Sequence, residues 1–180
     1  MPTVIVDRDG VINRDSARFI KTPDEWQPLP GSIQAIAGLC AAGFRVAIAS
    51  NQSGVGRGLL DAPTLDAIHQ KMLTAIGSGG GRIATTEYCP HSPDADCECR
   101  KPKPGLLRRI GDTLGIDLTN VPCIGDSRRD IEAALAVGAR PILVLTGNGR
   151  RTLEEGLDMD IEVYHDLKEA AEELIQELQA

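Results

Sequence analysis

The sequence predicts an α/β protein built on a Rossmann-like parallel sheet with helices on both faces. Three observations carry this prediction. Short apolar runs alternate with longer segments of helical spacing, polar residues follow directly where several apolar runs end, and no internal repeat interrupts the alternation. A chain of 180 residues can bury one core, so we expect a single domain spanning residues 1–180.

The predicted strands are short apolar runs, as expected for strands that helices cover on both faces. They comprise residues 4–6, 45–49, 121–124, 141–145 and 161–163. The predicted helices lie between these runs and repeat apolar residues at helical spacing. They comprise residues 33–42, 62–76, 105–114, 129–137 and 167–178. The glycine-rich residues 77–81 are expected to form a turn within the domain.

Composition limits the classes of partner. The net charge of −7 argues against general binding to nucleic acid or anionic membranes, and 3% aromatic residues leave little material for base stacking. The N-terminus lacks the basic start of a signal peptide, and no apolar run approaches the ~20 residues of a membrane span. We therefore expect a cytoplasmic protein acting on a small molecule. No sustained heptads demand assembly, so a monomer is expected.

The first predicted strand leads into Asp7-Arg8-Asp9-Gly10. Asp7 and Asp9 are two residues apart, so in an extended chain both carboxylates point to the same side. Such a pair can divide a phosphoryl transfer between a nucleophile and a general acid/base. An acidic turn or helix cap is the alternative explanation of the motif taken alone.

Further polar residues follow other predicted strands. Ser50-Asn51 supplies a hydroxyl and an amide suited to phosphate oxygens, Lys101 lies in a cationic stretch, and Asp126 follows the run at 121–124. Because ligands bind at the carboxyl ends of parallel strands, Asp7, Ser50 and Asp126 should share one pocket. Mg²⁺ prefers carboxylate oxygens, so Asp126 is expected to join Asp7 and the backbone carbonyl of Asp9 around this ion. Asp130 is expected to support this loop or the outer shell of the metal.

These four signals appear in the order typical of the haloacid dehalogenase superfamily, which the chain resembles over essentially its entire length. The resemblance implies a magnesium-dependent phosphatase with Asp7 as nucleophile. An aspartate at the position of Asp9 is the mark of the superfamily's phosphatases and phosphomutases. Residues 11–30 and 53–88 are too short for a large folded cap, so an open site is expected.

A second metal site is predicted in the loop 89–99. Three thiolates and one imidazole within eleven residues match a closed, four-coordinate structural Zn²⁺ site. The predicted ligands are Cys89, His91, Cys97 and Cys99. The loop ends on Arg100-Lys101, so Zn²⁺ would rigidify the segment that brings both cations to the phosphate.

Within the superfamily, the motifs resemble the zinc-loop branch that contains the heptose bisphosphate phosphatases. The resemblance rests on residues 7–13, 50–58, 89–91 and 99–102. It implies removal of the C7 phosphate of a heptose 1,7-bisphosphate through an aspartyl-phosphate, with Asp9 as general acid/base. Ser50 and Lys101 would steady the phosphoryl group, and Arg100 would recognise the substrate. The implied substrate-binding residues are Asp15, Ser16 and Arg18 on the sugar side and Ser50, Asn51, Gln52, Ser53, Arg100 and Lys101 on the phosphate side.

Three alternatives stay open from the sequence. Histidinol-phosphate phosphatases share the zinc loop but tend to carry an aspartate where this chain has Ser53, which disfavours a cationic substrate here. A polynucleotide 3′-phosphatase resembles the first two motifs but fits poorly with the charge of −7. A zinc-stabilised binding protein without turnover would retain the fold, although Asp7, Asp9, Lys101 and Asp126 are all present.

Overall fold

The computed structural model describes residues 1–157 and 159–180. Six strands form one parallel sheet in the order β3-β2-β1-β4-β5-β6. The strands are β1 (Thr3–Val6), β2 (Arg45–Asn51), β3 (Ile83–Cys89), β4 (Pro122–Gly125), β5 (Arg140–Val144) and β6 (Glu162–Tyr164). The predicted fold class is confirmed.

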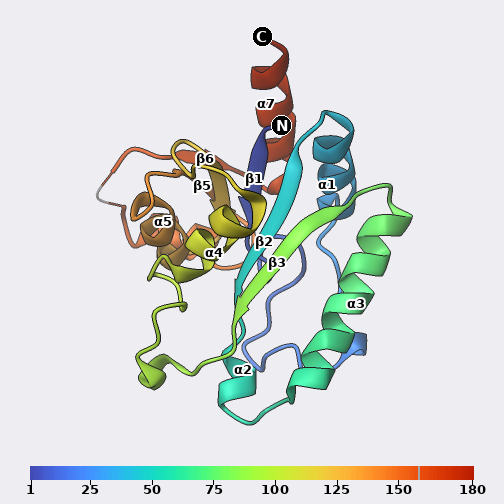
Figure 1. The fold of residues 1–180 in the computed structure, drawn as a ribbon, viewed down its shortest axis with the longest axis vertical. Helices are drawn as coiled ribbons and strands as arrows, with labels where there is room; N and C mark the ends of the chain where they lie inside the picture. Colours follow the sequence, from blue (N-terminus) through green and yellow to red (C-terminus); the bar gives the residue numbers. More distant parts are fainter. Residues whose placement is uncertain (158) are drawn as a thin grey trace.

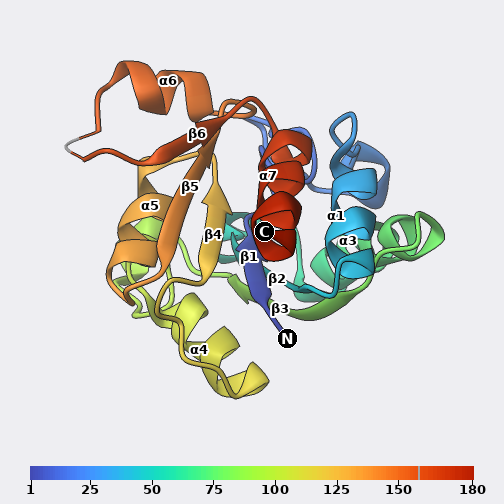
Figure 2. The same cartoon turned by 90° about the horizontal axis from the view of Figure 1, so that it is seen from above.

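Helices cover both faces of the sheet (Figures 1 and 2). The helices are α1 (Ser32–Ala41), α2 (Ser53–Gly56), α3 (Ala62–Ser78), α4 (Gly105–Leu114), α5 (Arg128–Leu135), α6 (Gly149–Glu154) and α7 (Leu167–Gln179), with 3-10 turns η1 (Pro23–Glu25) and η2 (Pro93–Ala95). One core cluster packs α1, α3 and α7 against the sheet, and a second packs α4 and α5 against the other face. Figure 2 shows the two layers on opposite sides of the strands.

Local sequence explains where the main elements begin and end. Val4, Ile5 and Val6 are buried on both faces, as β-branched residues of a central parallel strand should be. Asp61 is the N-cap of helix α3, and its carboxylate accepts a hydrogen bond from the Thr64 N–H. Asp166 caps α7 in the same way. These caps replace hydrogen bonds that the first turn of a helix lacks.

Two connections position the site. Residues 7–31 run from β1 to α1 across the carboxyl edge of the sheet and contain η1, while α2 and α3 lie between β2 and β3. Within the described residues neither connection holds a folded cap, as predicted, so the edge stays open. No helix in the described part of the chain has the length and apolar character needed to cross a membrane.

Candidate active site

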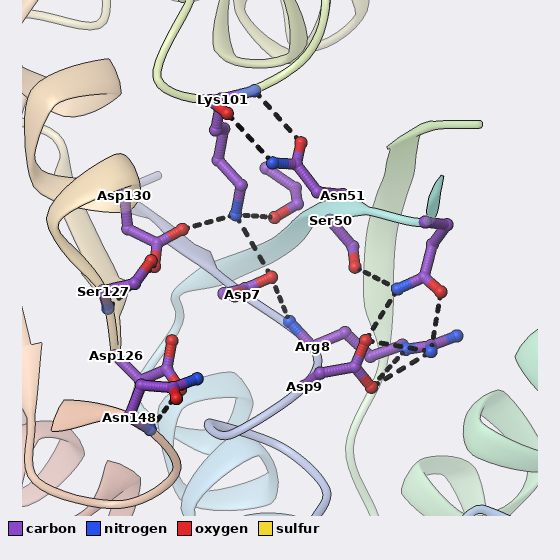
Figure 3. Close-up of polar contacts among 12 residues, drawn as sticks. Asp7, Arg8, Asp9, Ser50, Asn51, Lys101, Asp126, Ser127, Asp130 and Asn148 are labelled. Atoms are coloured by element: carbon purple, nitrogen blue, oxygen red, sulfur yellow. Dashed lines mark hydrogen bonds and ion pairs between the residues drawn. The ribbon is translucent and has the colours of Figure 1, made fainter. Parts of the chain in front are cut away.

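A pocket opens at the carboxyl edge of the sheet, where β1, β2 and β4 end. Its lining includes Asp7, Asp9, Asn51, Lys101 and Asp126, which come from four separate parts of the chain. Figure 3 shows these side chains gathered around the end of β1. The convergence expected from the strand ends is therefore present.

Asp7 lies at the centre of this group and is held by two donors. Its Oδ1 accepts from the backbone N–H of Arg8 at 2.8 Å and lies 3.1 Å from Lys101 Nζ. Lys101 is 4% exposed, and its ammonium also donates to the carbonyl of Ala49 at 2.7 Å. A buried ammonium beside this carboxylate can balance charge that a bound phosphoryl group brings.

Asp126 reaches the same centre from the end of β4. Its Oδ2 accepts from the backbone N–H of Asn148 at 2.8 Å, and Thr152 Oγ1 donates to its carbonyl at 2.9 Å. A Cβ on Gly10 or on Gly147 would lie 2.1 Å from Asp126 Oδ2, and both glycines have positive φ. The two glycines therefore admit this carboxylate and form the turns around it.

The cluster of carboxylates suits a divalent cation. Oxygens of Asp7, Asp126 and Asp130 all lie within 4.8 Å of one another. Burial raises the pKa of Asp7 well above its usual range, against the ammonium of Lys101, and neighbouring carboxylates raise it further. Burial and the nearby Asp130 raise the pKa of Asp126 to about 7. Buried carboxylates that repel one another favour the binding of a hard cation such as Mg²⁺.

Asp130 differs from the other two because both of its oxygens are engaged by the protein. Oδ1 accepts from Lys101 Nζ at 2.5 Å, and Oδ2 accepts from the Ser127 backbone N–H at 3.1 Å and from its hydroxyl at 2.6 Å. The Ser127 contacts form the capping box that begins α5. Asp130 is thus placed to orient Lys101 and the loop after β4.

The zinc loop folds its four predicted ligands into one cluster. The sulfur atoms of Cys89, Cys97 and Cys99 lie 3.2 to 3.6 Å apart, and His91 Nδ1 lies 3.5 Å from Cys89 Sγ and 3.3 Å from Cys99 Sγ. A tetrahedral Zn²⁺ with bonds of about 2.0–2.3 Å needs ligand atoms roughly 3.5–3.8 Å apart. Three of the five separations fall in this range and two, at 3.2 and 3.3 Å, are slightly shorter, so the four donors suit such an ion after a small outward adjustment. Burial opposes ionisation of Cys97, but the backbone N–H of Arg100 and the neighbouring thiols lower its pKa to about 6.

Other predicted site residues lie at different depths. Ser50 is 1% exposed and accepts from Gln52 Nε2 at 2.6 Å, beneath the residues that line the pocket. Asn51 ties the two halves of the site together, since its side chain exchanges two 3.0 Å hydrogen bonds with the backbone of Lys101. Gln52 and Ser53 line the pocket.

The residues expected to bind the sugar line two neighbouring hollows. Asp15 and Ser16 line the main pocket, whereas Arg18 lines a neighbouring hollow together with Lys21 and Glu25. Phe19 also lines the main pocket, with a φ of 64° that a residue with a side chain seldom adopts. Backbone strain of this kind is concentrated at functional sites.

Sequence reasoning missed Asn148 and Arg129. Asn148 Nδ2 donates to Asp126 Oδ2 at 3.2 Å and to Asp15 Oδ2 at 3.1 Å, which joins the metal side to the sugar side. The signal was available, because Thr146-Gly147-Asn148 follows β5 just as the other motifs follow their strands. Arg129 is exposed and lines the pocket next to the second aspartate of its motif.

Comparisons with known proteins agree with this geometry. A family model described as HAD-hydrolase-like matches residues 98–170. The chain is 51% identical over 175 residues to the D-glycero-β-D-manno-heptose-1,7-bisphosphate 7-phosphatase of Pseudomonas putida, with 97% of this chain and 100% of that protein covered. It is 41% identical to the enzyme of that name from Neisseria meningitidis, with 98% and 96% covered.

Solved structures give the same picture. The D,D-heptose 1,7-bisphosphate phosphatase of B. bronchiseptica, crystallised with magnesium and phosphate, is 52% identical and superposes with a TM-score of 0.96, covering 98% of this chain and 99% of that one. The corresponding phosphatase of Burkholderia thailandensis is 42% identical, with a TM-score of 0.77 and coverage of 97% and 99%.

Proposed function

Because the chain belongs to the D-glycero-β-D-manno-heptose-1,7-bisphosphate 7-phosphatase family of the haloacid dehalogenase superfamily, we propose that it removes the C7 phosphate of this β-anomeric sugar. The observation that carries the chemistry is the place of Asp7, between the buried ammonium of Lys101 and the carboxylate of Asp126. Nucleophile, counter-charge and metal ligand thus meet at one point.

In the proposed reaction, a carboxylate oxygen of Asp7 attacks phosphorus and the bond from phosphorus to the C7 oxygen breaks. Asp9 gives a proton to that departing oxygen. A water molecule then attacks the aspartyl-phosphate, Asp9 takes the proton of the water, and inorganic phosphate leaves. Lys101 stays charged throughout, because its contacts with Asp130 and Asp7 raise its pKa despite its burial.

Asp7, Asp126 and the backbone carbonyl of Asp9 are the groups that would hold Mg²⁺. When bound, the ion supplies positive charge opposite the transferring phosphoryl oxygens. The protein's own part is to hold the carboxylates together, through Asn148 on Asp126 and Lys101 on Asp7. We propose a structural role for Zn²⁺ in the loop 89–99, since four protein ligands leave no open position.

A bisphosphate needs a second cationic site, and two arginines offer one. Arg100 and Arg129 line the same pocket. Burial lowers the pKa of Arg100, and the charge of Arg129 lowers it further, so the two guanidinium groups repel one another. A phosphate between them would relieve this repulsion. We assign the C1 phosphate to this pair, with Asp15 and Ser16 near the sugar hydroxyls.

The histidinol-phosphate alternative is not favoured, because the relatives at about 50% identity are heptose bisphosphate phosphatases and the pocket wall at Ser53 is uncharged. Within the described residues the five cysteines form no disulfide, which supports a reducing compartment such as the cytoplasm. We propose a monomer, since the sequence shows no sustained heptads that demand assembly.

The test is a comparison of kcat/KM for the β and α anomers of the bisphosphate and for histidinol phosphate, with Mg²⁺ present and removed. We expect the β anomer to be preferred and Asp7→Asn to lose activity on the order of 10⁴-fold or more, as enzymes do when a nucleophile is removed. Faster turnover of histidinol phosphate would overturn the substrate. Equal rates for Asp7→Asn and the parent would overturn the phosphatase assignment.

A further inference from the structure

Arg8 is a charged side chain buried in an unusual place, directly between the two aspartates of the motif. It is 0% exposed. Its guanidinium turns back onto the next residue, with Nε 3.1 Å from Asp9 Oδ1 and Nη2 3.0 Å from Asp9 Oδ2. Burying an arginine costs more free energy than burying an apolar side chain, so such a residue needs a specific role.

Gln52 completes the arrangement from the end of β2, which it directly follows. Its Oε1 accepts from Arg8 Nη2 at 2.9 Å, and its Nε2 donates to Asp9 Oδ2 at 2.8 Å. Asn13 Nδ2 donates to the other oxygen, Oδ1, at 2.9 Å. In its ionised form Asp9 thus accepts four hydrogen bonds, as many as the lone pairs of a carboxylate allow. To carry the proton of the reaction it must give up one of them, and the bidentate contact with Arg8 is the one that we expect to persist.

This arrangement restrains Asp9 far more than its exposure would suggest. The Asp9 side chain is 21% exposed and lies at the pocket, where a side chain with two rotatable bonds would otherwise sample several rotamers. A guanidinium that binds a carboxylate through two parallel hydrogen bonds (a bidentate contact) fixes both the position and the plane of that carboxylate. Proton transfer requires such placement to within a fraction of an ångström.

We propose that Arg8, bridged by Gln52, is a positioning residue that holds Asp9 for proton transfer to the leaving oxygen. This inference rests on the proposed function, because it assumes that Asp9 is the acid of the reaction. The Arg8 side chain contacts no reacting atom and acts through Asp9. A role in folding alone is the competing explanation. It predicts that loss of Arg8 slows the reaction equally whether or not the leaving group needs a proton.

The experiment uses two kinds of phosphate ester. The alkoxide of a sugar needs a proton as it departs, whereas p-nitrophenolate leaves without one. In Arg8→Lys the charge remains, but one ammonium cannot span both Asp9 oxygens and Gln52. Gln52→Met removes the bridge at similar volume, and it carries the test should the Arg8 variant fail to fold. Arg45→Lys, on the far end of β2, is the matched control.

For both site variants we expect kcat on heptose 1,7-bisphosphate to fall about 10²-fold with little change in KM, as for a misplacement of about 1 Å. The first release of p-nitrophenolate in rapid-mixing experiments should stay within roughly threefold of the parent, since that step needs no acid. Later turnovers should be slow, because Asp9 also serves the second step. Arg45→Lys should leave both rates unchanged.

Equal losses in the sugar reaction and in the first release of p-nitrophenolate would overturn the proposal, as would lowered thermal stability with intact kcat. Failure of the proposed function is a separate result. It would appear as a parent enzyme that does not hydrolyse the bisphosphate at all. If the parent hydrolyses another sugar phosphate instead, the same ratio of rates still tests the role of Arg8.

Discussion

Arg129 is an exposed side chain for which we propose a role in specificity, namely binding the second phosphate of a doubly charged substrate. Arg129 and Arg100 line the same pocket, and the protein as a whole is anionic, with a charge of −7. Two guanidinium groups in one pocket therefore form a local positive region in an unfavourable overall field. In the proposed role, the two groups strengthen substrate binding only when the substrate carries a second phosphate, which is remote from the bond that breaks.

Arg129→Gln should accordingly raise KM for heptose 1,7-bisphosphate about tenfold, the worth of one hydrogen bond to a charged group. Heptose 7-phosphate lacks the second phosphate, so its kcat/KM should hardly change. Steady-state kinetics on both substrates measures the difference. Arg151→Gln, an exposed arginine paired with Glu155 on α6, is the control. A similar loss with both substrates would contradict the assignment of Arg129.

At the scale of elements, the zinc loop joins β3 to the cationic segment of the site. Cys89 ends β3, and Cys99 directly precedes Arg100 and Lys101. Lys103 adds ion pairs to Asp96 and Glu98, both 3.0 Å long and exposed, which are too weak to order the loop alone. The proposed metal coordination would be the stronger source of order here.

Cys97→Ser should therefore lower the zinc content, which we expect to be about one ion per chain in the parent. It should also reduce activity about tenfold, as mutations of residues around a bound metal do. Elemental analysis and kinetics measure both effects, while circular dichroism should show an unchanged sheet. Cys40→Ser is the matched control, since this thiol lies on α1, away from the loop. Full activity in a Cys97→Ser protein free of zinc would contradict the role of the loop.

The elements that sequence reasoning found are those with strong local signals. Helix α4 has the predicted bounds, and four other predicted helices differ from the observed ones by one or two residues at their ends. Strand β3 was missed because it is an edge strand with Thr85, Thr86 and Glu87 partly exposed, so it lacks a continuous apolar run. The short α6 was missed because it starts at Gly149 and has no side-chain cap.

The residues of the candidate site were easier to predict from the sequence than the side chains that hold them in place. Asp7, Lys101 and Asp126 follow from motif order and the strand-end rule. The pairing of Arg8 with Asp9 and the contact of Asn148 with Asp126 did not follow, because both depend on side-chain directions in the folded chain. Motifs predict which chemical groups meet, whereas the restraint on those groups comes from packing.

At the scale of the whole molecule, Arg140 on β5 links that strand to β6 and α7, at the edge of the sheet opposite β3. Its guanidinium pairs with Glu162 on β6 and with Glu177 on α7, where Arg140 Nη1 lies 2.7 Å from Glu177 Oε2. Tyr164 donates to Glu162 at 3.0 Å. These bonds link the last strand and the C-terminal helix to β5 through a network that involves charge on both carboxylates.

This network predicts a pH-dependent contribution to stability. Hydrogen bonds from Arg140 lower the pKa values of Glu162 and Glu177 in the folded protein. A carboxyl with a lowered folded pKa stabilises the protein above its unfolded pKa of about 4.3, and that contribution is lost as pH falls through the folded pKa. The groups are partly exposed, so about 0.5 to 1 kcal/mol is expected for each pair.

Glu177→Gln should therefore lower the free energy of unfolding by a constant amount between pH 8 and pH 5, and by less as pH falls below about 4. Urea unfolding at several pH values measures this difference, and 1 M salt should shrink it at neutral pH. Glu155→Gln, in the pair with Arg151, should have a smaller effect because that pair joins residues only four apart and both side chains are mostly exposed. A difference for Glu177→Gln that grows on acidification would show that Arg140 does not act through the charged carboxylate.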